Sequence, residues 1–124
     1  MADELTINWR ATFTKSGTDI TFPDPAKREF KVTITGTRFI LNRQSIGTSA
    51  EAIVLGEVVT GGYFFAVNRD ATNFVEIRPG AGLTDTIRLQ AGEGCMFRIS
   101  PDAAAPQAIA DTDAVELEYL LVEA

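Results

Sequence analysis

The chain has 124 residues, of which 45% are apolar, so it is long enough to bury one hydrophobic core and too short for two. It contains no histidine and one cysteine, which excludes a Ser-His or Cys-His nucleophile pair, a histidine zinc ligand and an internal disulfide. The formal net charge is −6 and no basic cluster is present, so we expect no nucleic acid as a partner. No apolar stretch approaches the roughly twenty residues that span a bilayer, so we expect no membrane either.

The first predicted strand covers residues 5–14, where apolar and polar side chains alternate. Its apolar positions are Leu5, Ile7, Trp9, Ala11 and Phe13. This two-residue period is typical of a strand with one buried face, and it predicts that Trp9 lies in the core. Residues 16–19 are turn formers, and residues 20–22 predict a short returning strand.

The remainder of the chain contains one short helical turn and a series of short strands. Asp24 followed by Pro25 predicts a capped turn over residues 26–29. Further strands are expected at 30–34, 38–42, 52–59, 63–68, 74–78, 86–90, 95–100, 107–110 and 115–121. The pair 86–90 and 95–100 predicts a hairpin. About nine or ten strands with this spacing indicate an all-β fold, an antiparallel β-sandwich or jelly roll, with a closed barrel as the alternative.

Three of these strands carry apolar side chains on both faces, which a sandwich with one core does not require. The residues that oppose their apolar neighbours are Ile40, Phe64, Leu120 and Val122. Covering loops or scattered surface apolars explain them equally well. The other explanation is that these four residues form a partner or oligomer interface, where each would remove apolar surface from water.

No pattern of residues selects a catalytic, cofactor-binding or metal site. Four acidic residues follow one another closely, Asp111, Asp113, Glu116 and Glu118, but the segment lacks the glycine of a calcium loop, so we expect solvent-facing carboxylates, with weak calcium binding as the alternative. Cys95 alternates with Phe97 on a strand and is expected to be a small buried hydrophobe. We therefore expect a non-enzymatic protein without cofactor or metal; a carboxylate hydrolase is a weaker alternative.

From about residue 45 onward the sequence resembles a group of small bacteriophage proteins encoded near virion structural genes. The segments that carry the resemblance are IGTSAEAI (46–53), GYFF (62–65), NRDATNFVEI (68–77), IRLQAGE (87–93), MFRI (96–99) and AVELEYLLVE (114–123). They are structural rather than catalytic motifs. The resemblance implies a capsid decoration, or cement, protein: a β-folded homo-oligomer, with a trimer favoured, that binds the major capsid protein on the outside of the virion.

The same resemblance leaves the beginning of the chain open. We expect one β-sandwich domain over residues 1–124, in which residues 1–44 either form part of an arm that faces the capsid or complete the sandwich. The first residues do not resemble a signal peptide, so synthesis in the host cytoplasm is expected. The alternative function is a tail or fibre β-module that binds host surface carbohydrate, which requires exposed aromatic side chains around a shallow groove.

Overall fold

The computed structural model describes residues 4–59, 62–80, 86–99 and 105–123, and nearly all of its regular structure is β-strand. The elements are β1 (Glu4–Asn8), β2 (Ala11–Lys15), β3 (Thr18–Phe22), the 3₁₀ turn η1 (Pro25–Lys27), β4 (Glu29–Thr33), β5 (Phe39–Ile46), β6 (Glu51–Ala52), β7 (Tyr63–Asn68), β8 (Val75–Arg78), β9 (Ile87–Leu89), β10 (Gly94–Arg98), β11 (Gln107–Ala110) and β12 (Val115–Val122). Every strand pairing is antiparallel. The predicted all-β, antiparallel class is confirmed, with more strands than the nine or ten expected.

The chain divides into two compact units. Residues 1–35 form the first unit and residues 36–124 the second. Residues 1–44 are expected either to form part of an arm or to complete the sandwich, but β5 begins at Phe39 and pairs with β12 along its whole length. The segment outside the sandwich therefore ends at residue 35, and residues 39–44 are part of the sandwich.

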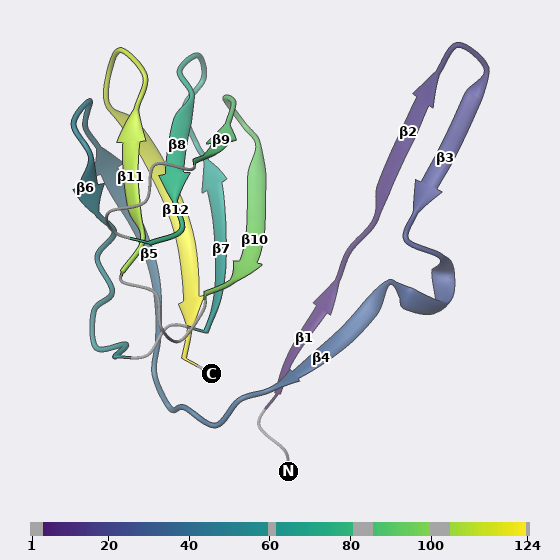
Figure 1. The fold of residues 1–124 in the computed structure, drawn as a ribbon, viewed down its shortest axis with the longest axis horizontal. Helices are drawn as coiled ribbons and strands as arrows, with labels where there is room; N and C mark the ends of the chain where they lie inside the picture. Colours follow the sequence, from purple (N-terminus) through teal and green to yellow (C-terminus); the bar gives the residue numbers. More distant parts are fainter. Residues whose placement is uncertain (1–3, 60–61, 81–85, 100–104, 124) are drawn as a thin grey trace. The chain divides into compact units, whose positions relative to one another are not determined.

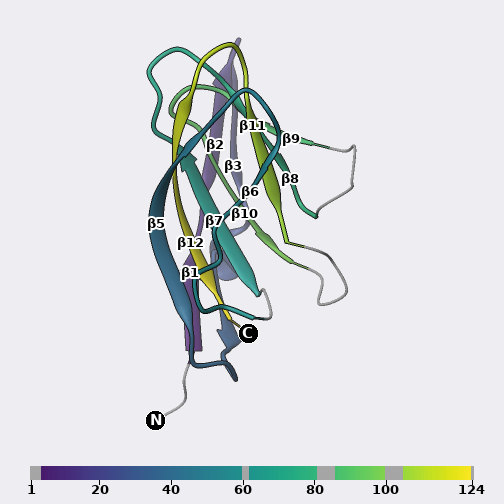
Figure 2. The same cartoon turned by 90° about the vertical axis from the view of Figure 1, so that its left-hand side faces the viewer.

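The second unit is a two-layered sandwich with jelly-roll connectivity. One sheet has the order β10-β7-β12-β5 and the other the order β6-β11-β8-β9. The first and last strands of the unit are neighbours, and each further pair nests inside the previous one, which is the double Greek key of a jelly roll. Figures 1 and 2 show the two sheets as separate layers, with the long β5 and β12 in one of them.

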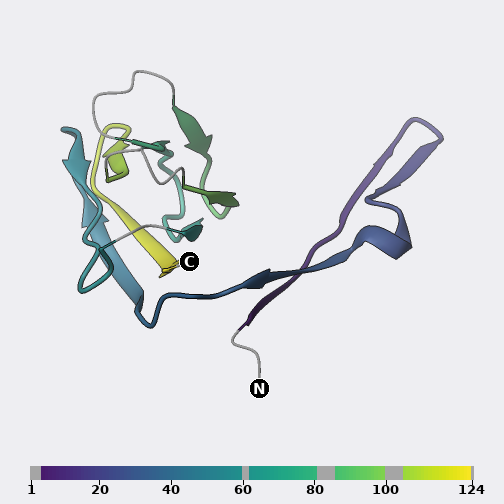
Figure 3. The ribbon, with the colours of Figure 1, turned by 60° about the horizontal axis from the view of Figure 1, so that its bottom comes forward.

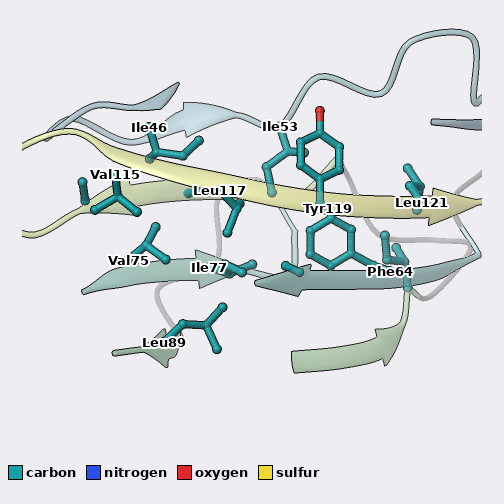
Figure 4. Close-up of a cluster of buried hydrophobic side chains, with 14 of the residues drawn as sticks. Ile46, Ile53, Phe64, Val75, Ile77, Leu89, Val115, Leu117, Tyr119 and Leu121 are labelled. Carbon is teal, nitrogen blue, oxygen red and sulfur yellow. The ribbon is translucent and has the colours of Figure 1, made fainter. Parts of the chain in front are cut away.

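The core lies between these two sheets. Alternate residues of β7 and β12 are buried, as the two-residue period requires. Phe64 of β7 is fully buried and lies between two other rings, with its centroid 5.8 Å from that of Tyr119 and 5.2 Å from that of Phe97. Figure 4 shows Phe64 and Tyr119 close together within the cluster of buried hydrophobic side chains. Aromatic contacts of this kind add to the free energy gained by burying the rings.

One polar side chain is fully buried among the described residues, and it holds the loop after β7. The amide nitrogen of Asn68 donates to the carbonyl oxygens of Asn73 and Leu89, at 2.9 and 3.0 Å. Its amide oxygen accepts from the backbone N–H of Asp70 at 2.8 Å. Asn68 therefore joins the loop after β7 to the end of β9, and its hydrogen bonds offset the cost of burying it.

The same loop is closed by the carboxylate of Asp70. The backbone N–H groups of Asn73 and Thr72 donate to it at 2.6 and 3.0 Å. These two bonds stabilise the charged form and lower the pKa of Asp70 below its usual value of 3.8. The loop between β7 and β8, which lie in different sheets, therefore depends on side chains that bond to backbone groups within the loop.

The first unit is a long two-stranded ribbon, which we call the arm. β1 pairs with β4 near its base and β2 pairs with β3 at its tip. Figure 3 shows this ribbon with η1 interrupting the return between β3 and β4. Asp24 caps η1 by accepting from the backbone N–H of Ala26 at 3.0 Å, which confirms the predicted capped turn.

Two predictions about the strands of the sandwich are wrong. Residues 86–90 and 95–100 were expected to form a hairpin, but β9 pairs with β8 and β10 pairs with β7, in different sheets. The strand expected at 52–59 is only β6, at Glu51–Ala52. The chain turns away from the sheet after β6, and Gly56 has a φ of 60°, which a β-strand does not accommodate.

Candidate functional site

Apolar side chains from three neighbouring strands meet on the outer face of the β10-β7-β12-β5 sheet. Six residues, which we call the sheet patch, form two rows across the sheet: Leu41, Leu120 and Phe65 in one, and Phe39, Val122 and Tyr63 in the other. Phe39 and Leu41 are 68% and 66% exposed, and the other four are half-buried. Directly opposite residues on one face of a sheet are in contact, so the patch is continuous.

The sheet patch continues onto the edge strand β10. Met96 lies opposite Phe65 and Arg98 lies opposite Tyr63. The guanidinium of Arg98 is 5.0 Å from the centroid of the Tyr63 ring, within the range of a cation–π interaction. One row is therefore apolar across all four strands, and the other ends in a cation.

Charged residues border the sheet patch on the side toward the start of β12. Glu118 lies in the next row, where its carboxylate oxygens are 3.7 Å from Nε of Arg43 and 3.8 Å from Nε of Arg69. Glu116 follows one row further on, 3.6 Å from Nη1 of Arg43. These partly exposed ion pairs contribute little to stability. They mark where the apolar surface ends.

The orientation of β5 explains why Phe39 and Leu41 point outward. Asn42 and Gln44 point inward on this strand, and both are hydrogen-bonded there. Asn42 donates to the hydroxyl of Tyr119 at 3.2 Å, and Gln44 accepts from the backbone N–H of Val54 at 2.9 Å. The Tyr119 hydroxyl in turn donates to the carbonyl oxygen of Val54. Because these bonded polar groups hold Asn42 and Gln44 on the inward side of β5, Phe39 and Leu41, which alternate with them along the strand, face outward.

Two of the four predicted interface residues lie on the wrong face for a contact with another chain. Phe64 is fully buried in the core, and Ile40 packs against the core, where a Cβ atom at Gly56 would lie 3.0 Å from its Cδ1. Both assignments are wrong, because the inward faces of β5 and β7 are the opposite of those assumed. Leu120 and Val122 do lie on the outer face, and their contact with a partner stays a prediction.

The tip of the arm carries a second exposed apolar surface. Four residues, which we call the arm patch, form two rows: Phe13 opposite Ile20, and Ala11 opposite Phe22. Phe13, Ile20 and Phe22 are each more than half exposed. The other face of the same hairpin is polar, and on it the Thr14 hydroxyl donates to Asp19 at 2.9 Å.

Trp9 is not in the core, so the prediction for this residue is wrong. Its side chain is 36% exposed and meets the ring of Phe22 edge-on, with 5.4 Å between centroids. The two-residue period correctly indicates a strand with one apolar face. The arm, however, is a two-stranded ribbon without a second sheet, so nothing within the described residues of the arm covers the face that carries Trp9. Trp9 also lines an open hollow of about 320 Å³ with Asn8, Arg10 and Arg28.

Cys95 lies on the inner side of β10 and packs against the core. Burial raises the pKa of its thiol to about 11, and a hydrogen bond with the backbone of Ala66 acts in the opposite direction. The thiolate is the reactive form of cysteine, so this environment disfavours nucleophilic chemistry at neutral pH.

We therefore expect Cys95 to react slowly in the folded protein. At pH 8, alkylation by iodoacetamide should be roughly tenfold slower, or more, than in the unfolded chain, because the folded protein contains less thiolate. The reaction can be followed by mass spectrometry, with the same protein in denaturant as the control. Equal rates in the two conditions would show that the thiol is not protected.

The acidic turn before β12 resembles an ordinary capped turn. The backbone N–H of Ala114 donates to the carboxylate of Asp113 at 2.9 Å, and the hydroxyl of Thr112 donates to the amide oxygen of Asn73 at 3.2 Å. Within the part of the chain that the structure describes, no group of three or more His, Cys, Asp or Glu side chains is close enough to hold a metal ion.

Comparisons with known proteins do not assign a family. No family model matches the chain, and no curated protein matches it. A solved chain from Bacillus endospore appendages, a family of disulfide-linked pili, is similar in structure over 70% of this chain and 87% of its own length, with 12% identity and a TM-score of 0.40. A likeness at this level does not bear on function. Among the described residues, no helix has the length and apolar character to cross a membrane.

Proposed function

We propose that this chain is a non-enzymatic structural protein of a bacteriophage virion, which decorates the outside of the capsid as a homotrimer and stabilises the lattice of the major capsid protein. The sheet patch carries the proposal. A continuous apolar face over three neighbouring strands is larger than the scattered apolar residues that a monomeric protein leaves in water, and such faces mark contacts with other proteins. The resemblance of residues 46–123 to phage virion proteins supplies the kind of partner.

The jelly-roll connectivity is compatible with this function and does not by itself establish it. Jelly rolls occur in viral capsid proteins and in lectins, so the fold alone leaves both candidate functions open. The proposal depends instead on the surface. A decoration protein needs a folded body and surfaces complementary to its neighbours, and the arm and the sandwich each present one apolar surface.

The test compares phage shells assembled with and without the chain. We expect purified protein to bind mature shells that lack it and to raise the temperature at which they release DNA. The variant Phe39→Ser/Leu41→Ser should lose this effect, whereas Val59→Ser should retain it, because Val59 is 77% exposed but lies outside the sheet patch. Shells that are equally heat-resistant with and without the protein would contradict the proposal.

A second candidate function has one observation in its favour, the exposed Trp9. A tail or fibre module that binds carbohydrate needs an exposed aromatic ring beside hydrogen-bonding groups, and the hollow lined by Trp9, Asn8, Arg10 and Arg28 provides both. Trp9 is the one tryptophan of the chain, so its fluorescence reports on this hollow directly. A glycan array without hits, together with unchanged fluorescence on addition of sugars, would exclude this function.

A further inference from the structure

We propose that the arm patch of one copy of this chain docks onto the sheet patch of a second copy. The contact would join an arm to a sandwich, so it uses two different surfaces and is heterologous. Such a contact closes into a ring when the rotation between copies permits it, and three copies in a ring would give a trimer. The inference concerns contacts between copies and does not rest on the proposed capsid function.

The first support is the match between the two surfaces. Each consists of two apolar rows, and successive rows lie two residues apart along a strand, which is nearly the same distance in both. Two sheets that pack face to face keep their strands within about 30° of each other. The row of Phe13 and Ile20 can therefore lie over the row of Leu120, with the row of Ala11 and Phe22 over that of Val122.

The second support is charge. Residues 1–35 contain five basic and five acidic residues, so the arm is formally neutral, whereas residues 36–124 contain six basic and twelve acidic residues and carry all of the net charge of −6. Two sandwiches placed face to face would bring like charges together. A neutral arm on an acidic sandwich avoids that repulsion.

The position of one lysine strengthens the argument. Lys15 follows Phe13 by two residues on the same face of β2, and within the described residues it makes no ion pair. With the rows aligned as above, Lys15 lies over the row of Glu118 and beside Glu116, at the charged border of the sheet patch. The contact would then pair apolar with apolar rows and bring Lys15 beside Glu116, which has one ion-pair partner, Arg43, among the described residues.

The experiment uses the full chain and two double variants. Phe13→Ser/Phe22→Ser damages only the arm patch, and Phe39→Ser/Leu41→Ser damages only the sheet patch. All four side chains are more than half exposed, so the sandwich should keep its circular dichroism and its Tm. Thr12→Ser, on the polar face of the arm, is the matched control for the first variant, and Val59→Ser is the control for the second.

Sedimentation velocity over a range of concentrations measures the outcome. We expect the wild type and both controls to form a concentration-dependent oligomer, and each double variant alone to be monomeric. An equimolar mixture of the two double variants should form a one-to-one dimer, because the intact arm of one can dock onto the intact sheet of the other. Lys15→Glu should weaken the wild-type oligomer, most strongly at low salt.

Three results would overturn the inference. A wild-type chain that stays monomeric at all concentrations would show that the two surfaces do not bind each other between copies. An oligomer that survives in Phe13→Ser/Phe22→Ser would indicate a contact between two sheet patches. A mixture of the double variants that remains monomeric would exclude a heterologous contact. Binding to phage shells is measured separately: an arm-to-sheet oligomer that does not bind shells would contradict only the proposed function, and a trimer that binds shells through another contact would contradict only this inference.

Discussion

Replacing Phe64 with alanine is expected to lower the free energy of unfolding by about 3–5 kcal/mol, the range for removing a buried aromatic side chain. The ring is fully buried and contacts the rings of Phe97 and Tyr119, so its loss removes both apolar burial and two aromatic contacts. The surrounding strands belong to a continuous hydrogen-bonded sheet, which limits how far they can collapse into the cavity. Guanidinium unfolding at low protein concentration measures the change.

The neighbouring residue provides the control. Phe65 follows Phe64 on β7 but points to the outer face, where it belongs to the sheet patch and is half-buried. Phe65→Ala should therefore cost about 1 kcal/mol in the dilute monomer, in proportion to the smaller area that it buries. Equal losses in the two variants would contradict the difference in burial between the two faces of β7, and a larger loss for Phe65→Ala would mean that the faces are assigned the wrong way round.

Replacing Asn68 with alanine is expected to destabilise the fold by about 3 kcal/mol, because it leaves several buried backbone groups without partners. The carbonyl oxygens of Asn73 and Leu89 lose their donor, and the N–H of Asp70 loses its acceptor. An unsatisfied buried polar group costs about 1–3 kcal/mol, and the loop after β7 can move to let water reach some of these groups. Thermal and chemical unfolding measure the loss.

A second asparagine separates this effect from the general cost of truncation. Asn42 also points inward, but it donates one hydrogen bond, to the Tyr119 hydroxyl, and it is only half-buried. Asn42→Ala should cost about 1 kcal/mol. Hydrogen exchange should also show that Asn68→Ala exposes the amides of residues 70–73, whereas Asn42→Ala leaves them protected. A small loss at Asn68 with an unchanged loop would contradict the role assigned to it.

In the sandwich, local sequence patterns predict where the strands lie but not how they pair. Seven of its eight strands lie near expected positions, because alternation and turn residues are properties of a few consecutive residues. The pairing of these strands is not local. The segment 91–93 looks like a hairpin turn, yet β9 and β10 separate into different sheets. In a jelly roll, strands far apart in sequence pair with each other. The residues of a short turn do not indicate whether the strands on either side of it pair with each other or with more distant strands.

The sheet patch shows that local patterns also fail to determine which individual residues of a strand point outward. The sequence pattern points to the three strands of the sheet patch, since each has apolar residues on both faces. The pattern correctly predicts that Leu120 and Val122 lie on the outer face, but the prediction for β5 and β7 names Ile40 and Phe64, whereas the outward residues are their neighbours Phe39, Leu41, Tyr63 and Phe65. On β5, the hydrogen bonds of Asn42 and Gln44 to Tyr119 and Val54 decide which face is inward. Those partners are more than nine residues away along the chain.

The amino-acid sequence by itself determined the all-β class and the antiparallel strands, because alternation and turn formers are properties of neighbouring residues. Its composition, which contains no histidine, excluded histidine chemistry. Only the tertiary structure decided where the arm ends, which face of each two-faced strand is covered, and that Trp9 and Phe13 are exposed rather than buried. The physical reason is that burial is a property of layers. A strand with one apolar face is the same in sequence whether or not a second sheet lies against it.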